Sequence, residues 1–266
     1  MLYPVIQNVD LGEGWRHLEV DAPELAPRCR AGQFVQVRVG EGDDPLVRRP
    51  FSVYDVGPAP GAQARRLSVL YQVVGPGTRW MARLSPGDPV DLLGPLGNPF
   101  PQFDLPPDGR LILIGGGIGV APLFFYCREL LAERRGLDVH VLIGARRRSL
   151  LVSEPRFREH GFPLAVATND GSSGHHGTVI ELLEAVTRGL EPRQVAGVGC
   201  GPHAMNMALR EFAVRRDFDL WIALDNYMPC GFGACFGCVI PSPGGGYRRV
   251  CVDGPAFPAR EIPTAG

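Results

Sequence analysis

The chain has 266 residues, of which 45% are hydrophobic, and its formal net charge is −1 at pH 7. This length predicts two domains with a small appendage, and the near-neutral charge excludes electrostatic attraction to nucleic acid or to an anionic membrane. No apolar run approaches the roughly 20 residues of a membrane span, and the first residues carry no visible export signal. A reducing cytoplasm is therefore the expected compartment.

Short runs in which apolar and polar residues alternate dominate the first hundred residues, as expected of half-buried strands. Turn sequences separate these runs, and no long helical pattern lies between them. Residues 1–103 are therefore predicted to form a small antiparallel β-barrel. The predicted strands are 15–20, 34–39, 51–54 and 67–73.

Two places in the predicted barrel carry residues suited to binding a phosphate. In Arg49-Pro50-Phe51-Ser52, the Arg can hold a phosphate with two hydrogen bonds and the Ser can add a hydroxyl. Gly75-Pro76-Gly77-Thr78 opens a predicted helix over 79–84, whose free N–H groups would seat an anion. The simpler readings are an exposed basic strand edge and a plain turn with a helix cap.

After a Pro-rich junction the pattern changes. Continuous apolar runs alternate with helical periods, which is typical of parallel strands covered by helices on both faces. Residues 104–224 are therefore predicted to form a doubly wound parallel sheet that binds its ligand at the carboxyl ends of the strands. The predicted strands are 111–114, 139–143, 164–167, 194–198 and 221–224, and the predicted helices are 123–135, 179–188 and 204–215.

Three strand ends of this sheet carry candidate ligand-binding residues. Gly115-Gly116-Gly117-Ile118-Gly119 lies between a strand and a helix, as a dinucleotide loop does, although Val120 holds the third glycine position. Asp170-Gly171-Ser172 follows the third strand and Cys200-Gly201-Pro202 follows the fourth. A packing turn and an ordinary Gly-Pro helix start are the simpler readings of the first and last. The arginines at 146–148 either hold an adenosine 2′-phosphate or face water.

Cys230, Cys235, Cys238 and Cys251 follow the spacing C-x4-C-x2-C-x12-C. Four thiolates can enclose a [2Fe-2S] cluster, and the first three repeat the spacing of plant-type ferredoxins. The intervening glycines allow the positive φ angles of a loop curled around sulfur. A structural zinc site is the alternative, although zinc motifs usually pair two C-x2-C knuckles. The odd total of seven cysteines argues against disulfides.

Over essentially its whole length the chain resembles the electron-transfer subunits of NAD-dependent dihydroorotate dehydrogenases, in the ferredoxin–NADP reductase superfamily. The resemblance rests on Arg49-Pro50-Phe51-Ser52, the GGGxGxxP and CGP motifs, and C-x4-C-x2-C-x12-C-x-D-G-P. Phe51 replaces the usual Tyr, and Asp225 and Pro229 replace the usual Glu and Ala. The implied parts are an FAD-binding barrel (1–103), an NAD-binding domain (104–224) and a C-terminal [2Fe-2S] domain (225–266).

The resemblance also implies a role for each matching residue. For FAD these are Arg49, Pro50, Phe51, Ser52, Gly77 and Thr78, with Val53, Leu70, Tyr71 and Gln72 beside the isoalloxazine ring. For NAD they are Gly117, Gly119, Asp170, Gly201 and Pro202, and Cys200 would lie near the nicotinamide without being a certain catalytic residue. The implied cluster ligands are Cys230, Cys235, Cys238 and Cys251.

The implied function is electron transfer between NAD and a partner subunit that carries FMN and oxidises dihydroorotate in pyrimidine biosynthesis. Two chains of each kind would form a heterotetramer. A nicotinamide transfers a hydride and a cluster takes one electron at a time, so FAD must lie between them. The alternative is an NAD(P)H reductase subunit for ferredoxin, a sulfur compound or hydrogenase. In ferredoxin–NADP relatives an Asp replaces the first ligand, so Cys230 favours the dihydroorotate family. The tail 259–266 is expected to be disordered.

Overall fold

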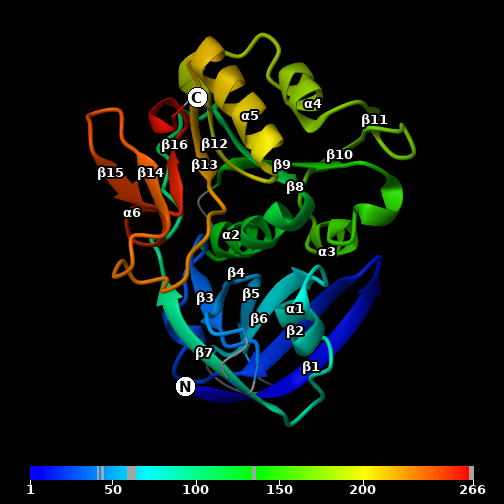
Figure 1. Cartoon of the computed structure of the whole chain (residues 1–266). Coiled ribbons are helices and arrows are strands. Elements are labelled where there is room, and N and C mark those ends of the chain that lie inside the picture. Colours follow the sequence, from blue (N-terminus) through cyan, green and yellow to red (C-terminus); the bar gives the residue numbers. More distant parts are fainter. Residues whose placement is uncertain (41, 43–44, 59–63, 134–135, 264–266) are drawn as a thin grey trace.

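The computed structural model describes residues 1–40, 42, 45–58, 64–133 and 136–263. Two seven-stranded sheets make up most of the molecule, one above the other in Figure 1. A small C-terminal segment, orange and red in Figure 1, runs along their side. Among the described residues no helix is long and apolar enough to cross a membrane.

The first sheet is wholly antiparallel, with the strand order β4-β3-β7-β1-β2-β6-β5. β4 also contacts β6, so the sheet curls and its two ends approach each other as in a barrel. Inward-facing side chains such as Val35, Val37 and Val90 are buried inside it. Its elements are β1 (Leu2–Gly12), β2 (Trp15–Asp21), β3 (Phe34–Val37), β4 (Arg49–Ser52), β5 (Asp55–Pro58), β6 (Ala64–Gln72), α1 (Pro76–Met81) and β7 (Pro89–Leu96).

The second sheet has the order β11-β10-β9-β8-β12-β13-β16 and is parallel except at β16. Leu111 and Leu113 of β8 pack with α2, whereas Ile112 and Ile114 pack with α4 and α5 on the opposite face. This confirms the doubly wound architecture. Its elements are β8 (Arg110–Gly116), α2 (Val120–Glu133), β9 (Asp138–Ala145), α3 (Glu154–Glu159), β10 (Leu164–Thr168), β11 (His175–His176), α4 (Val179–Val186), β12 (Val195–Cys200), α5 (His203–Arg216) and β13 (Asp219–Ala223).

The C-terminal segment contains β14 (Val239–Pro241), β15 (Tyr247–Arg249), α6 (Val250–Asp253) and β16 (Ala256–Pro258). β14 and β15 pair as a small separate sheet, and β16 returns to pair antiparallel with β13. The segment also binds the barrel, because Gln36 Nε2 donates to the Met228 carbonyl at 2.5 Å and Asn98 N donates to the Gly254 carbonyl at 2.7 Å. These contacts hold the cysteine loop against both sheets.

Several element predictions need correction. The tail is ordered as far as residue 263: Ile262 is buried, and its carbonyl accepts a 2.6 Å hydrogen bond from Arg210 Nε. Residues 264–266 lie outside the described part of the chain, as do residues 134–135 of the predicted helix 123–135. Helix α1 begins at Pro76, three residues earlier than predicted, because Pro is well suited to the first helical turn.

Candidate functional site

A cavity of about 500 Å³ lies between the two sheets. The barrel contributes one wall through β4 and β6, and the turn after β8 together with the end of β12 contributes the opposite wall. The segment that follows β13 closes a third side. A second cavity of about 600 Å³ adjoins it and shares Pro50, Phe51, Val74, Thr78, Asp225 and Met228. The two together form one continuous binding region.

The structure brings most of the predicted cofactor-binding residues to these cavities. The first cavity is lined by Pro50, Phe51, Ser52, Leu70, Tyr71, Gln72, Thr78, Gly119, Cys200, Gly201 and Pro202. The second adds Arg49 and Gly77. Among the predicted residues, Val53, Gly117 and Asp170 line neither cavity. Val53 is fully buried in the barrel core instead.

The barrel wall is shaped by aromatic packing and by the turn into α1. The rings of Phe51 and Tyr71 meet edge to face at 6.1 Å, and the Tyr71 hydroxyl donates to Asn8 Oδ1 at 3.0 Å. Thr78 Oγ1 accepts hydrogen bonds from Val74 N at 2.9 Å and Gly75 N at 3.1 Å. The hydroxyl therefore holds the turn in shape. A Cβ at Gly77 would lie 2.7 Å from Val39 Cγ2, so only glycine allows this close packing.

On the opposite wall, the turn after β8 crosses the end of β12. A Cβ at Gly119 would overlap the carbonyl oxygen of Cys200, so glycine is required for the two segments to touch. Burial raises the pKa of the Cys200 thiol to about 12, and the nearby Asp225 carboxylate adds to this effect. The thiol is therefore neutral at pH 7 and is suited to packing against a ligand rather than to nucleophilic chemistry.

Asp170 lies in an exposed loop at the carboxyl end of β10. Its Oδ1 accepts hydrogen bonds from Ser172 N at 3.0 Å and Ser172 Oγ at 2.5 Å, and these bonds lower the pKa of Asp170. Ser172 Oγ in turn accepts from Arg148 N at 2.8 Å. Asp170 thus orders this loop, at the same sheet edge as the cavity but two strands away from β8.

Some lining residues were not predicted from the sequence. Asp225 and Met228 border both cavities, and burial raises the pKa of Asp225. Phe34, Phe100 and Pro255 border the first cavity from three separate parts of the chain. The position of Asp225 directly after a strand of the parallel sheet was an available signal, because ligands gather at such strand ends. No motif in the local sequence marks Met228, Phe34, Phe100 or Pro255 as a lining residue.

The cysteine loop begins two residues after Met228. Cys238 and Cys251 are buried with their sulfur atoms 3.3 Å apart, Cys230 is half-buried, and Cys235 is exposed. Backbone N–H groups point at sulfur: Gly237 N lies 3.4 Å from Cys235 Sγ, and Cys251 N lies 3.5 Å from Cys238 Sγ. Within the described residues, no three Cys, His, Asp or Glu side chains converge as ligands of one metal ion. A [2Fe-2S] cluster spreads four thiolates over two irons and so does not need three of them on one ion, and these four soft donors, with N–H groups directed at them, fit such a cluster.

Cys230 is set apart from the other thiols by its surroundings. Burial works to raise its pKa, but N–H groups of the loop, at Cys235, Phe232 and Ala234, outweigh burial and lower the pKa to about 6. Burial raises the pKa of Cys251 to about 12, with a further contribution from Cys238. In the protein without metal, Cys230 is therefore better prepared than Cys251 to bind as a thiolate.

This difference predicts which of the two thiols, Cys230 or Cys251, reacts first in the metal-free protein. Iodoacetamide is expected to modify Cys230 faster than Cys251, with a rate that rises through pH 6 and levels off above it, because the Cys230 thiolate forms there. Cys251 is expected to react slowly until far higher pH. Peptide mass spectrometry after timed quenching measures both rates. Equal rates at pH 7 for the two thiols would show that the N–H groups of the loop do not favour the Cys230 thiolate.

Comparison with known proteins gives the family. Residues 225–263 match a family model described as the iron–sulfur cluster binding domain of dihydroorotate dehydrogenase B. The dihydroorotate dehydrogenase B (NAD(+)) electron transfer subunit of Geobacillus kaustophilus (strain HTA426) is 41% identical over 233 residues, which span 87% of this chain and 86% of that one. The chain belongs to this family. The corresponding subunit of Geobacillus thermodenitrificans (strain NG80-2) is 36% identical over 97% of this chain and 96% of its own.

Solved structures show the same fold. A structure of an NADH-dependent reduced ferredoxin–NADP oxidoreductase, studied for flavin-based electron bifurcation, is 27% identical with a TM-score of 0.83, covering 99% of this chain and 90% of that one. A ferredoxin–NADP+ reductase from Neisseria gonorrhoeae, solved with bound FAD and NADP, is 20% identical with a TM-score of 0.62, covering 81% of this chain and 91% of that one. At 20% identity, the similarity to the Neisseria gonorrhoeae reductase shows a shared fold and nothing more.

Proposed function

We propose that this chain passes electrons between NAD and a partner subunit that carries FMN and oxidises dihydroorotate in pyrimidine biosynthesis. FAD would occupy the two adjoining cavities, and a [2Fe-2S] cluster would bind Cys230, Cys235, Cys238 and Cys251. One observation carries the proposal: a single cavity is bordered by the barrel, by the turn at Gly119 and by Met228, two residues before the cysteine loop. A flavin there would exchange a hydride with nicotinamide and single electrons with a cluster.

The proposed division of labour follows the three parts of the chain. Residues 1–103 would hold FAD, with Arg49 and Ser52 at its diphosphate or ribityl region, Gly77 and Thr78 at its pyrophosphate, and Tyr71 beside its ring. Residues 104–224 would hold NAD, with Gly117 and Gly119 at its pyrophosphate, Cys200-Gly201-Pro202 near its nicotinamide and Asp170 on its ribose side. Residues 225–266 would hold the cluster. The lining of the two cavities supports the assignments on the barrel wall and those of Gly119 and Cys200-Gly201-Pro202. The roles of Gly117, Asp170 and the cluster ligands rest on the sequence motifs.

The assembly is proposed to contain two copies of this chain and two of the FMN-containing subunit, in a reducing cytoplasm. An NAD(P)H reductase subunit for ferredoxin, a sulfur compound or hydrogenase is the second candidate. The similarity to the ferredoxin–NADP oxidoreductase structure over 99% of this chain supports this second candidate function. The two candidate functions differ in the partner protein and in the electron acceptor, and the domain order of this chain is compatible with both.

Anaerobic co-expression with a dihydroorotate-oxidising flavoprotein tests the proposal. We expect a complex of two plus two chains that contains FAD, FMN, iron and sulfide and reduces NAD when dihydroorotate is added. Native mass spectrometry gives the stoichiometry, and absorbance at 340 nm follows the NADH formed. A protein that stays alone and reduces ferredoxin rapidly would support the second candidate. A colourless protein without iron would overturn both.

A further inference from the structure

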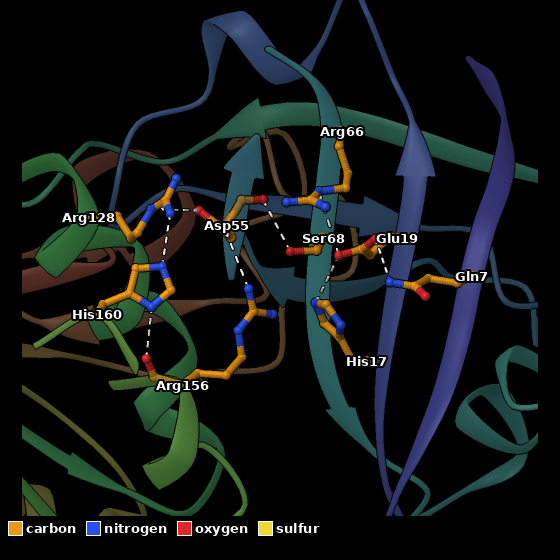
Figure 2. A network of polar contacts seen from close by, with 9 residues as sticks. All are labelled: Gln7, His17, Glu19, Asp55, Arg66, Ser68, Arg128, Arg156 and His160. Carbon is orange, nitrogen blue, oxygen red and sulfur yellow. Dashed lines mark hydrogen bonds and ion pairs between the residues drawn. The ribbon is translucent and has the colours of Figure 1, made fainter. Parts of the chain in front are cut away.

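A buried carboxylate of the barrel faces two arginines of the nucleotide-binding half (Figure 2). Asp55, the first residue of β5, is only 3% exposed. Its Oδ1 lies 3.6 Å from Arg128 Nε of α2, and its Oδ2 lies 3.8 Å from an Arg156 side-chain nitrogen of α3. One side chain from the barrel is thus paired with two helices that belong to the other sheet.

Aromatic packing accompanies these ion pairs at the same boundary. Tyr54, next to Asp55, stacks on Phe124 of α2 with ring centroids 4.9 Å apart and an interplanar angle of 26°. The Arg156 guanidinium carbon lies 5.2 Å from the Tyr54 centroid and 5.0 Å from that of Phe124. The cation therefore interacts with both rings as well as with the carboxylate. We call these five residues, Tyr54, Asp55, Phe124, Arg128 and Arg156, the interdomain joint.

Each side of the joint is supported by its own half of the molecule. His160 Nε2 accepts a 3.0 Å hydrogen bond from Arg128, and His160 Nδ1 donates to the Arg156 carbonyl at 2.9 Å, which ties α2 to α3 (Figure 2). On the barrel side, Ser68 Oγ of β6 donates to the Asp55 carbonyl at 3.2 Å. Both sets of partners are therefore held in place by contacts within their own half of the molecule.

The chemistry of the joint favours a role in orientation over a role in adhesion. Burial raises the pKa of Asp55, and the charges of Arg128, Arg156 and Arg66 oppose that rise. Apolar side chains would hold two halves together without desolvating a carboxylate, and buried ion pairs add little net stability. Charged partners with defined positions instead favour one relative placement of the two halves.

The joint is connected to the cavity walls by short rigid segments. Asp55 lies three residues after Ser52, which lines the first cavity on the barrel side. Arg128 lies in the same helix as Ala121 and Pro122, which line the opposite wall, about two helical turns away. A displacement at the joint therefore moves the two walls relative to each other.

We propose that the interdomain joint is a positioning device that sets the spacing and tilt between the flavin wall and the nicotinamide wall. The inference rests on the proposed function, because it concerns how close two bound rings come. Asp55, Arg128 and Arg156 act through the walls that they align and touch neither ring. Rates of hydride transfer depend steeply on this alignment, since a shift of about 1 Å can cost about 100-fold.

The Asp55→Asn variant tests the joint because it removes the charge and keeps the size. We expect the rate of flavin reduction by NADH to fall about tenfold while KM for NADH changes less than about twofold, because the nucleotide contacts stay intact. The long-wavelength charge-transfer absorbance of the flavin with nicotinamide is expected to weaken in parallel. FAD and iron contents are expected to match the wild type. Asp55→Glu, which keeps the charge, is expected to recover most of the rate.

Asp21→Asn is the matched control. Asp21 of β2 pairs with Arg65 of β6 at 2.8 Å, so both partners belong to the barrel and neither lines a cavity, and this variant is expected to keep the wild-type rate and spectrum. If Asp55→Asn fails to fold, Arg156→Gln removes the same pair from a partly exposed position. An Asp55→Asn protein with a wild-type rate and charge-transfer band would overturn the inference alone. A wild-type protein that binds no flavin would overturn the proposed function instead.

Discussion

The Cys235→Ser variant is expected to lose dihydroorotate-dependent NAD reduction in the assembled complex by more than about 100-fold, since even changing a residue that only hydrogen-bonds to a metal ligand costs about 10- to 100-fold. NADH oxidation with a small dye is expected to continue near the wild-type rate. The physical reason is the separation of the two sites: Cys235 lines neither cavity, and its exposed thiol belongs only to the cysteine loop. Steady-state assays with the two acceptors measure the difference.

Cys29→Ala is the control for this experiment. Cys29 is a buried thiol of the barrel whose Sγ lies 3.4 Å from the Leu25 carbonyl oxygen, far in the chain from the cysteine loop. The variant is expected to keep its iron and both activities. Iron analysis and electron paramagnetic resonance of the reduced proteins report on the cluster directly. If Cys235→Ser retained or lost both activities equally, the proposed electron route would be wrong.

The Gly119→Ala variant is expected to slow flavin reduction by NADH by about 100-fold, the effect of roughly 1 Å of misplacement between reacting groups. A single methyl group would overlap the Cys200 carbonyl oxygen, which is backbone and cannot rotate away. The turn after β8 and the end of β12 must then separate, and both line the cavity wall opposite the barrel, where nicotinamide is proposed to bind. Stopped-flow bleaching of the flavin absorbance measures the rate.

The same substitution elsewhere provides the comparison. A Cβ at Gly244, in the turn between β14 and β15, would have no heavy atom within 4 Å. Gly244→Ala is therefore expected to reduce its flavin at the wild-type rate. Both variants are expected to keep iron, because neither glycine belongs to the cysteine run, and to keep FAD, because neither lies on the barrel wall proposed to hold it. Wild-type kinetics in Gly119→Ala would show that the close contact with Cys200 does not align the nicotinamide.

Regular patterns in the sequence led to correct predictions of strands whose apolar residues lie next to one another along the chain. The apolar runs at 111–114 and 139–143 became β8 and β9 because residues buried on both faces need no alternation. The strand β1 was missed, since Leu2 and Ile6 remain exposed and its alternation is incomplete. β16 was missed as well, because three residues carry too little periodicity to be recognised.

What the sequence by itself determined is the chemistry of the ligands: four cysteines at fixed spacing, glycines at tight turns and a change from alternating to continuous apolar runs. These features act within a few residues, so they can be read along the chain. Only the tertiary structure decided that Phe51, Cys200 and Met228 border one cavity and that Asp55 meets Arg156. An apolar pattern predicts that a residue is buried, but it does not identify the residues that pack against it. Phe51 and Met228, for example, lie 177 positions apart in the sequence.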